Sequence, residues 1–589
     1  MKYSATMVPR VRAMSNSRSC LLDQSGRFTL VTLPMVTGLA PGEPTKVGGL
    51  RGDPYFRRFN SRPCPLPEGC LALSGWCRAI RGGDSMSTTL QAEPVTEPVG
   101  DRLAPVCWRP IALITALVAV VVGLTNGRRG YFGDELYFVI AGRHLDWGYA
   151  DQPPMAPLLA HLMDTVAPGQ LWWLRFPVLL GELTAIWLAA LIAREMGGGG
   201  RAQWMTAAAY AITAIGRAHL LSTNALDIPL WTAITLLLVR WVRTRRDMNL
   251  FWAGVLTAVS LQVKFLIPGF WLMLGISVLL FGPRRMLGRP ALWLGAAVAI
   301  AAWVPGLIWQ ASHGWPQIAM GAQIAHDQDA VGGRWTLLPL FLLMCGILAG
   351  LTLFVYGLTR LLGSGLMRPY RFFGWTFVLL TAFVILVNGH PWYLMGLLPV
   401  CWAAGAVHAE RGAGERWWRW SVSRYAVALT LIGTCVFTPP WQPLTQPPAT
   451  DTERAAMFIP MAELEWPELT DKVAAAYRAL PPAEREQTAI LSDSYFGASA
   501  LEFYGRTRGL PTAYSPDRGY WYFGAPPESA KHVLWLGLPS DKLKAKFAKV
   551  TDQGPIGLPM SVLDDNHILL YENRRESWAT LWPELNTLG

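Results

Sequence analysis

The stretch Trp108–Phe138, WRPIALITALVAVVVGLTNGRRGYFGDELYF, sets the pattern for most of this chain. Its uncharged part, at about 110–127, has the length that a helix needs to cross roughly 30 Å of hydrocarbon. A short polar loop with an Asp-Glu pair follows. Because apolar runs and polar loops continue to alternate along the chain, we predict an α-helical protein that crosses a membrane many times.

The composition agrees with this prediction. Of the 589 residues, 52% are hydrophobic and 15% are charged, which is too apolar for a soluble domain of this size. The net charge of +11 comes largely from Arg residues scattered between apolar runs, so it indicates membrane topology and no nucleic-acid partner. The eight Cys residues match neither a zinc pattern nor a disulfide framework.

The apolar runs predict about eleven transmembrane helices, with ten or twelve as alternatives. They lie at about 110–127, 171–193, 202–216, 225–239, 248–263, 265–283, 290–312, 335–359, 372–389, 391–407 and 425–439. Alternate loops are rich in Arg, and the loops between them are rich in acids. By the positive-inside rule, we expect the N-terminus in the cytoplasm and the Asp-Glu loop outside the cytoplasmic membrane.

The two ends of the chain differ from this middle part. Residues 1–105 lack a long apolar run and are expected to be a disordered extension, and Met86 offers an alternative start that would make 1–85 a mis-called segment. A Pro-rich linker at 440–450 follows the membrane domain, which we place at 106–439. Residues 451–589 alternate helical and strand patterns and predict a small extracytoplasmic α/β domain, with strands at 488–492, 532–537 and 567–572.

Four acids are candidates for chemistry at the outer surface: Asp134, Glu135, Asp151 and Asp227. An enzyme that transfers a group from a lipid carrier needs a carboxylate there to deprotonate its acceptor. Simpler roles compete with this one. Asp134 and Glu135 could form a solvated cap or pair with Arg128 and Arg129, Asp151 could form the turn before Pro153, and Asp227 could cap the next helix.

Three cations could hold a phosphate leaving group: Arg217, Lys264 and His390. Lys264 interrupts the apolar stretch 248–283, where a charge is costly unless it snorkels or pairs. A predicted loop at 326–334 contains His326, Asp327 and Asp329, which could bind a cation, although a hydrated loop is the favoured interpretation. No cofactor is predicted, and a divalent metal is left open.

Several stretches together carry a resemblance to a known family. The sequence resembles the protein O-mannosyltransferase-like family of GT-C membrane glycosyltransferases, which includes the lipid A aminoarabinose transferases. The stretches span about 110–408 and read DELYF, GYADQPPMAPLL, LRFPVLLGELTAIWLAALIARE, LLSTNALDIPLW, VSLQVKFLIPGFWLML and NGHPWYLMGLLPVCWAAGA. The tail stretches DSYFGASALEFYG and GLPTAYSP are similar to the outer domain of bacterial members.

The resemblance implies a function and roles for the candidate residues. Such enzymes move a sugar from a polyprenyl-phosphate carrier to an acceptor outside the membrane, which can be a protein, a glycan or a lipid, and they typically invert the anomeric carbon. Asp134 would be the general base, with Glu135 as its companion. Asp151 and Asp227 match acids of the outer loops, and Lys264 matches a Lys near the carrier phosphate.

Two positions depart from the family pattern. His390 stands where many relatives have Lys, and Gln152 stands where His is frequent. The charge of the phosphate site and any metal that such a His would support are therefore in doubt.

Two other functions compete with the enzyme. A transporter or flippase of polyprenyl-linked sugars also needs charges within the membrane, but transporters commonly show internal repeats, and this sequence shows none. A non-catalytic subunit of an envelope-assembly complex would use the outer domain only for docking. The clustering of acids at one surface favours the transferase, and the sequence identifies neither sugar nor acceptor.

Overall fold

The computed structural model describes residues 103–588 except 331, 413–415, 439 and 442–443, together with two short N-terminal strands. These strands, β1 (Cys20–Leu22) and β2 (Phe28–Leu30), pair antiparallel. By its internal contacts the chain divides into Met1–Glu93 and Pro94–Gly589. Of residues 1–102, the structure describes only β1 and β2. The predicted disordered extension and the alternative start at Met86 therefore lie outside the described residues. The second unit carries the fold that follows.

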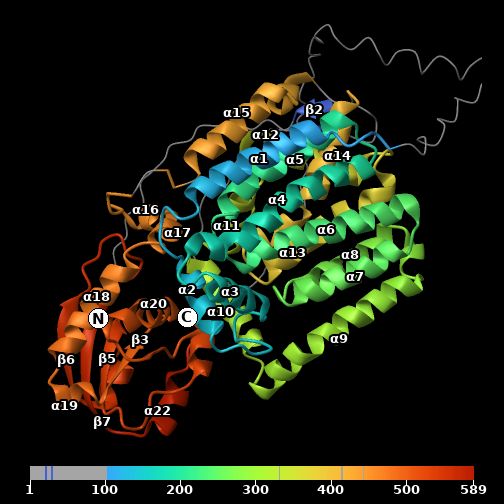
Figure 1. The fold of residues 1–589 in the computed structure, drawn as a ribbon. Coiled ribbons are helices and arrows are strands. Elements are labelled where there is room, and N and C mark those ends of the chain that lie inside the picture. The colour runs from blue at the N-terminus through green and yellow to red at the C-terminus, as the bar shows by residue number, and fades with distance from the viewer. Residues whose placement is uncertain are drawn as a thin grey trace, which may run out of the picture. The chain divides into compact units, whose positions relative to one another are not determined.

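A bundle of apolar helices forms the larger part of this unit (Figure 1). Its helices are α1 (Trp108–Thr125), α4 (Leu171–Glu195), α5 (Gly200–Arg217), α6 (Thr223–Thr244), α7 (Met248–Leu261), α8 (Ile267–Phe281), α9 (Pro290–Ser312), α11 (Arg334–Met344), α12 (Ile347–Gly363), α13 (Arg371–Leu386), α14 (Leu398–Glu410) and α15 (Arg424–Phe437). Every apolar run of the sequence is thus largely helical. Within the described chain, six helices are long and apolar enough to cross a membrane, and three others are shorter.

The run at 335–359 is not the single straight helix that its hydropathy predicts. Helices α11 and α12 meet at a bend of 110°, so they form either a broken span or a re-entrant loop. The bend lies at Gly346, whose φ of 94° suits glycine and few other residues. Helix α12 also packs very closely against α14. A Cβ on Gly357 would overlap the backbone of Cys401, so only glycine fits at this contact.

Three short helices lie between the bundle and the C-terminal domain (Figure 1): α2 (Gly133–Ala141), α3 (Met155–Val166) and α10 (Pro316–Ala330). Helix α10 corrects one expectation, since the segment containing His326, Asp327 and Asp329 is helical rather than a loop. The short 3-10 helix η3 (Pro391–Leu397) leads directly into α14.

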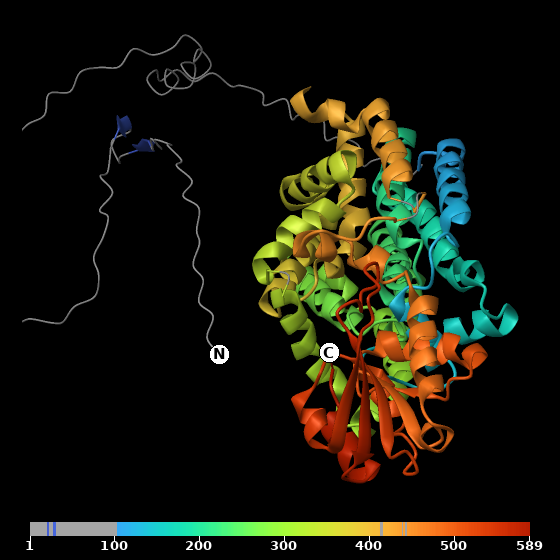
Figure 2. The same cartoon turned by 90° about the vertical axis from the view of Figure 1, so that its left-hand side faces the viewer.

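The C-terminal domain is built on a five-stranded sheet (Figure 2). The strand order is β4-β3-β5-β7-β6, with β3 parallel to β4 and β5, and β7 antiparallel to β5 and β6. The strands are β3 (Thr488–Ser492), β4 (Ala513–Tyr514), β5 (His532–Gly537), β6 (Phe547–Pro555) and β7 (His567–Arg574). Three of them lie where the sequence predicts strands, whereas β4 and β6 do not follow from its pattern.

Short helices surround this sheet. They are α16 (Asp451–Ala456), α17 (Phe458–Met461), α18 (Trp466–Ala479), α19 (Pro482–Arg485), α20 (Tyr495–Gly505), α21 (Asp541–Ala545), α22 (Trp578–Leu585) and the 3-10 helices η5 (Arg506–Arg508) and η6 (Arg518–Phe523). Figure 2 shows the sheet and its helices at one end of the helical bundle. The fold class is therefore as the sequence predicts, a helical membrane protein with a small α/β domain.

Helix α2 belongs to the hydrophobic core of the C-terminal domain. Its buried Leu136 and Phe138 lie in one cluster with Trp466, Leu501 and Leu534 of the domain. Trp466 also donates a hydrogen bond from Nε1 to the carbonyl oxygen of Tyr131, at 2.9 Å. The carboxyl ends of the parallel strands β3 and β4 lead into α20 and η6, and α20 packs directly against α2. The sheet domain therefore helps to position the carboxylates at the start of α2.

Candidate active site

Asp134 lies in the first turn of α2 and reaches the C-terminal domain. The hydroxyl of Tyr495, the first residue of α20, donates a hydrogen bond to Asp134 Oδ1 at 2.7 Å. Burial raises the pKa of Asp134, while the bond from Tyr495 and the charge of Arg518 lower it and so favour the ionised form. This carboxylate is fixed in position and partly exposed, as a general base requires.

Glu135 points away from Asp134 and into the protein. It is fully buried, and Arg175 of α4 binds it with two bonds, Nε to Oε1 at 2.8 Å and Nη2 to Oε2 at 2.7 Å. Its oxygens also accept the backbone N–H groups of Phe132 and Leu221. The two adjacent acids diverge because neighbouring helical positions are about 100° apart. The contacts of Glu135 favour a positioning role, and its direct part in catalysis stays a prediction.

The Arg175 ion pair extends to the C-terminal domain. Arg175 Nη2 lies 3.2 Å from Oε1 of Glu463, and Arg129 Nη1 lies 3.6 Å from the other oxygen of Glu463. Among the ion pairs of the described chain, neither Arg128 nor Arg129 pairs with the Asp-Glu motif. The interpretation of these two Arg residues as its ion-pair partners is therefore wrong. The network joins α4 of the bundle to α2 and to the segment before α18.

Asp151 lies near the same end of the sheet domain. It accepts a hydrogen bond from the hydroxyl of Tyr137 at 3.0 Å, and Tyr137 lies one turn after Asp134 on α2. Burial raises the pKa of Asp151 to about 6, against the lowering effect of Arg518. The charge of Asp134 also acts on this group. Asp134 and Asp151 therefore belong to one electrostatic unit.

Arg518 is the cation of this unit, and the sequence patterns did not single it out. It begins η6, four positions after the end of β4, with an unusual φ of 49°. Its guanidinium lies over the ring of Tyr495 at 4.9 Å and 3.5 Å from Asp327 of α10. The only sequence signal would have been its place after a short strand, and this strand does not follow from the sequence pattern.

Lys264 occupies the break between α7 and α8. Its ammonium group donates a hydrogen bond to the side chain of Asn224 and lies 4.6 Å from the centre of the Tyr393 ring. Asp227 is close enough for its charge to act on Lys264, and its Oδ1 accepts a bond from Ser260 Oγ at 2.6 Å. Asp227 is not a helix cap, because Ser222 caps α6.

A cavity of about 190 Å³ unites Asp151 with Lys264. Its lining includes Asp151, Gln152, Lys264, Gln317 and Tyr393. The amide Nε2 of Gln152 and the amide Oε1 of Gln317 have no hydrogen-bond partner among the residues that the structure describes. Buried amide groups normally have partners, so these two are free to bind a ligand.

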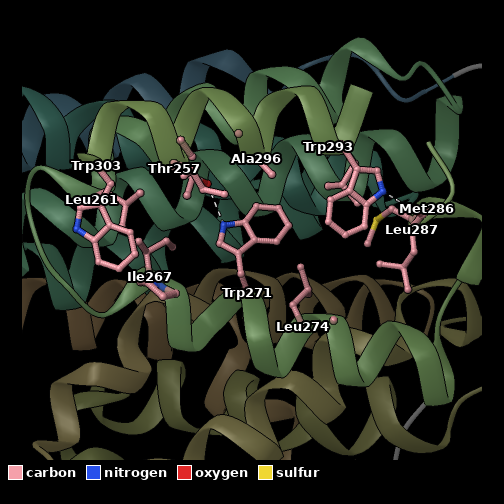
Figure 3. Close-up of a pocket in the computed structure, with 16 residues that line it drawn as sticks. Thr257, Leu261, Ile267, Trp271, Leu274, Met286, Leu287, Trp293, Ala296 and Trp303 are labelled. Carbon is pink, nitrogen blue, oxygen red and sulfur yellow. Dashed lines mark hydrogen bonds between the residues drawn. The ribbon is translucent and has the colours of Figure 1, made fainter. Parts of the chain in front are cut away.

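An apolar groove runs along α8, and its lining residues are drawn in Figure 3. Its volume is about 330 Å³, and it is formed by α7, α8 and α9 with the chain between α8 and α9. Leu261 and Ile267 line one end of it, and they bracket Lys264 in the sequence. Trp271 lies midway, with its Nε1 bonded to Thr257 Oγ1 at 2.9 Å. The groove thus begins next to the charged cavity.

The other predicted cations have different surroundings. Nδ1 of His390 lies 3.1 Å from Gln328 Oε1, and its ring stacks on Trp392. Burial and the charge of Lys264 lower the pKa of His390 to about 4, which makes it neutral at physiological pH. Arg217 binds Glu182 of α4 with two bonds, at 2.9 and 3.0 Å. This ion pair joins α4 and α5 and neutralises Arg217, whose predicted substrate contact is untested.

The three residues that could have bound a cation do not share one site. Asp327 pairs with Arg518, and Asp329 accepts a bond from Asn388 Nδ2 at 2.8 Å. Within the described ranges, no group of three or more His, Cys, Asp or Glu side chains could hold a metal ion.

A second and larger cavity lies beyond the carboxyl ends of β3 and β4. Its volume is about 610 Å³, and its walls come from α10, α17, the starts of α20 and η6 and the segment 562–566. It touches Tyr495 and Arg518, which it shares with the Asp134 unit, whereas Asp151 and Lys264 line only the smaller cavity.

Comparisons with known proteins agree with this architecture. Residues 151–309 match the family model described as dolichyl-phosphate-mannose-protein mannosyltransferase. The apo structure of ArnT from Cupriavidus metallidurans superposes with a TM-score of 0.53 and 15% identity, covering 78% of this chain and 97% of that chain. The structure of the same protein bound to undecaprenyl phosphate gives 0.50 and 14%, with the same coverage. No curated protein sequence matches the chain.

An apolar helical bundle with a C-terminal α/β domain gives the chain the GT-C type of fold and the composition of a multi-pass membrane protein. Residues 151–309 match the mannosyltransferase family model and the fold is similar to that of ArnT, so the resemblance predicted from the sequence is confirmed.

Proposed function

We propose that this protein transfers a sugar from a polyprenyl-phosphate carrier to an acceptor at the outer face of the cytoplasmic membrane. The observation that carries the proposal is the single cavity that contains Asp151 and Lys264 and lies next to an apolar groove. A lipid-linked sugar has the same three parts in the same order: a sugar, a phosphate and a hydrocarbon chain. The related ArnT has been solved with undecaprenyl phosphate bound.

The carrier phosphate fits beside Lys264. The ammonium group donates to a neutral partner, Asn224, and lies over a ring face, Tyr393. Neither contact cancels its charge, and the charged group that acts on it is Asp227. The hydrocarbon chain would then follow the groove past Leu261 and Trp271. Because that groove is almost wholly apolar, it suits a prenyl chain better than a hydrated ligand.

The donor sugar would occupy the cavity between Lys264 and Asp151. Gln152 and Gln317 offer amide groups without partners in the described chain, and sugar hydroxyls can donate to or accept from them. Asp151 can accept a further hydroxyl proton in a hydrogen bond. These groups would orient the anomeric carbon towards α2.

Asp134 would act as the general base. The acceptor oxygen forms a bond to the anomeric carbon, its proton moves to the Asp134 carboxylate, and the bond to the phosphate breaks with its electrons on the leaving polyprenyl phosphate. Such a single displacement inverts the anomeric carbon. Arg518 and Tyr495 support the ionised form of Asp134, which this step requires. Lys264 compensates the charge that develops on the phosphate.

The transferase can be distinguished from a carrier transporter and from a non-catalytic subunit by one substitution. Asp134→Asn keeps the size of the side chain and removes the base, so transfer should fall by at least about a hundredfold while carrier binding is kept. Transfer from polyprenyl-phosphate sugars into envelope fractions would be measured in nanodiscs. Asp565→Asn, at a side chain that is 80% exposed, is the matched control. Unchanged transfer in Asp134→Asn would contradict the proposed base.

A further inference from the structure

The larger cavity lies where open α/β sheets commonly bind ligands. From β3 the neighbouring strands extend both ways, β4 on one side and β5 on the other. Crevices at the carboxyl ends of parallel strands beside such a point are frequent ligand sites. The cavity is lined by residues that follow β3 and β4, namely Asp493, Ser494, Tyr495, Asp517 and Arg518, together with Asp327, Phe458, Phe496 and Asn566.

Asp517 provides an observation that points to a ligand. Its side chain is only 5% exposed, and Oδ2 accepts the backbone N–H of Tyr495 at 3.2 Å. Its Oδ1 is buried and has no hydrogen-bond donor in the part of the chain that the structure describes. A buried carboxylate oxygen without a donor is costly, and burial raises the pKa of Asp517 to about 6. A ligand hydroxyl in the cavity would supply the missing donor.

The charges of the cavity disfavour an anionic ligand. Three carboxylates line it, and the single guanidinium, Arg518, is already paired with Asp327 at 3.5 Å. A phosphate would meet net negative charge there. Hydroxyl groups, by contrast, donate readily to carboxylates, and Asn566 adds an amide that bonds to Asp493 at 3.3 Å.

The remaining walls are apolar and aromatic. Phe458 and Phe496 lie near each other, with ring centres 6.5 Å apart, and Val562 and Leu563 complete this side. A sugar ring likewise has a polar and an apolar part, with hydroxyl groups at its edge and C–H groups on its faces. The volume of about 610 Å³ lies within the usual range for small-molecule sites and accommodates more than one ring.

We propose that this cavity binds the acceptor, and that the acceptor is a saccharide. This inference rests on the proposed transferase function. Tyr495 forms part of the cavity wall, and its hydroxyl donates to Asp134. An acceptor hydroxyl beside Tyr495 would therefore give its proton to Asp134 as its oxygen attacks the anomeric carbon. The donor enters through the cavity of Lys264, and the acceptor enters through the cavity of Asp517.

Saccharide binding can be measured without any transfer reaction. The full chain would be placed in nanodiscs free of maltoside detergent, because a maltoside head group is itself a saccharide. Saturation-transfer NMR with the methyl glycosides of mannose, glucose and galactose should show magnetisation transfer to ring protons of at least one of them. Absence of transfer for all three, or transfer only to a Ser/Thr-rich peptide offered as an alternative probe, would overturn the inference.

Substitutions locate this binding in the cavity. Val562→Trp fills the space, so the saccharide signal should fall at least tenfold, whereas Val550→Trp on strand β6 of the same sheet should keep it. Val562→Cys tests the same point after folding, since the unmodified protein should bind and the protein modified with a bulky methanethiosulfonate should not. Wild-type protein treated with the reagent is the control. A signal that survives blockage at position 562 places the saccharide elsewhere and overturns the inference.

The outcome for the cavity is separate from that for the transferase. Lys264→Met should weaken binding of undecaprenyl phosphate and leave the saccharide signal unchanged. If the wild-type protein binds the methyl glycosides in this cavity but never binds or uses the carrier, the proposed transferase fails while the saccharide site remains. A saccharide signal that is lost in Lys264→Met would contradict the assignment of two separate entrances.

Discussion

The hydroxyl of Tyr495 donates to the carboxylate of Asp134 at 2.7 Å, across 361 positions of the sequence. Asp134 lies in the first turn of α2, and Tyr495 is the first residue of α20, which follows the first strand of the C-terminal sheet. The C-terminal domain therefore contributes directly to the electrostatic state of the candidate base, because it supplies both Tyr495 and Arg518 to the same carboxylate.

Tyr495→Phe removes this hydrogen bond and should raise the pKa of Asp134. The bond stabilises the ionised carboxylate, so without it more alkaline solution is needed to ionise the base. The acidic limb of the profile of kcat/KM against pH should therefore move to higher pH. Tyr477→Phe, which loses a bond to a backbone carbonyl elsewhere in the domain, should leave the limb in place. An unmoved limb in Tyr495→Phe would show that Asp134 does not set it.

The pH profile also shows whether Asp134 or Asp151 is the general base. Asp151 has a pKa of about 6, which would suit a base working near neutral pH. With Asp134 as the base, Asp151→Asn should raise the KM for the donor and retain an acidic limb. Loss of that limb in Asp151→Asn, with the limb kept in Asp134→Asn, would assign the base to Asp151 instead.

Lys264→Met should impair carrier binding without unfolding the protein. Loss of a charge-assisted hydrogen bond costs roughly 1.5–3 kcal/mol, which corresponds to about tenfold to a hundredfold in affinity or rate. Binding of undecaprenyl phosphate to the protein in nanodiscs checks this. Lys549→Met, on the exposed edge strand β6, is the control. Equal affinity in the two variants would mean that Lys264 only fills the break between α7 and α8.

Glu135→Gln should act mainly on stability. Arg175 is buried with Glu135, and removing one partner of a buried ion pair typically costs roughly 3–5 kcal/mol. The unfolding temperature should fall clearly, while folded protein keeps most of its activity per molecule. Glu528→Gln, at a side chain that is 56% exposed, removes a pair with Arg574 and should lower the unfolding temperature much less. A stable but inactive Glu135→Gln protein would restore the catalytic role predicted from the sequence.

Membrane orientation follows from thiol labelling. A cysteine at position 565, next to the sheet domain, should react with an impermeant reagent from outside the cell. One at the exposed position 285, in the turn between α8 and α9, should react only after the cells are opened. The opposite pattern would invert the predicted topology.

Local sequence signals could predict the membrane half of the site. Asp134 follows an apolar run, Asp151 precedes a Pro-Pro pair, and a lone charge in an apolar stretch marks Lys264. The other half could not be predicted in this way, because Tyr495 and Arg518 lie in an unremarkable stretch and meet Asp134 only through the tertiary fold. The ion pair of Arg217 could not be predicted either. Arg217 has no acidic neighbour in the sequence, because its partner Glu182 lies 35 positions earlier, on α4.

The break at Gly346 illustrates a similar limit for the fold. Hydropathy measures how apolar a segment is and does not measure its direction, so 335–359 reads as one helix although it bends by 110°. Helix α10 was missed for a related reason. Its polar surface resembles that of a loop, and its helical state depends on contacts such as those of Asp327 and Gln328 with distant residues.

The shared core of α2 and the sheet domain has a consequence for biosynthesis. Tyr131 is made 335 positions before Trp466, the residue that covers it, and at about 5–20 residues per second this is a delay of roughly 20–70 s. During this time the apolar side of α2 has no domain to bury it, while most of the bundle is still being inserted. The surface that α2 shares with the sheet domain can therefore form only at the end of translation, and a nascent chain stopped within the Pro-rich linker would leave the apolar side of α2 accessible to chaperones and proteases.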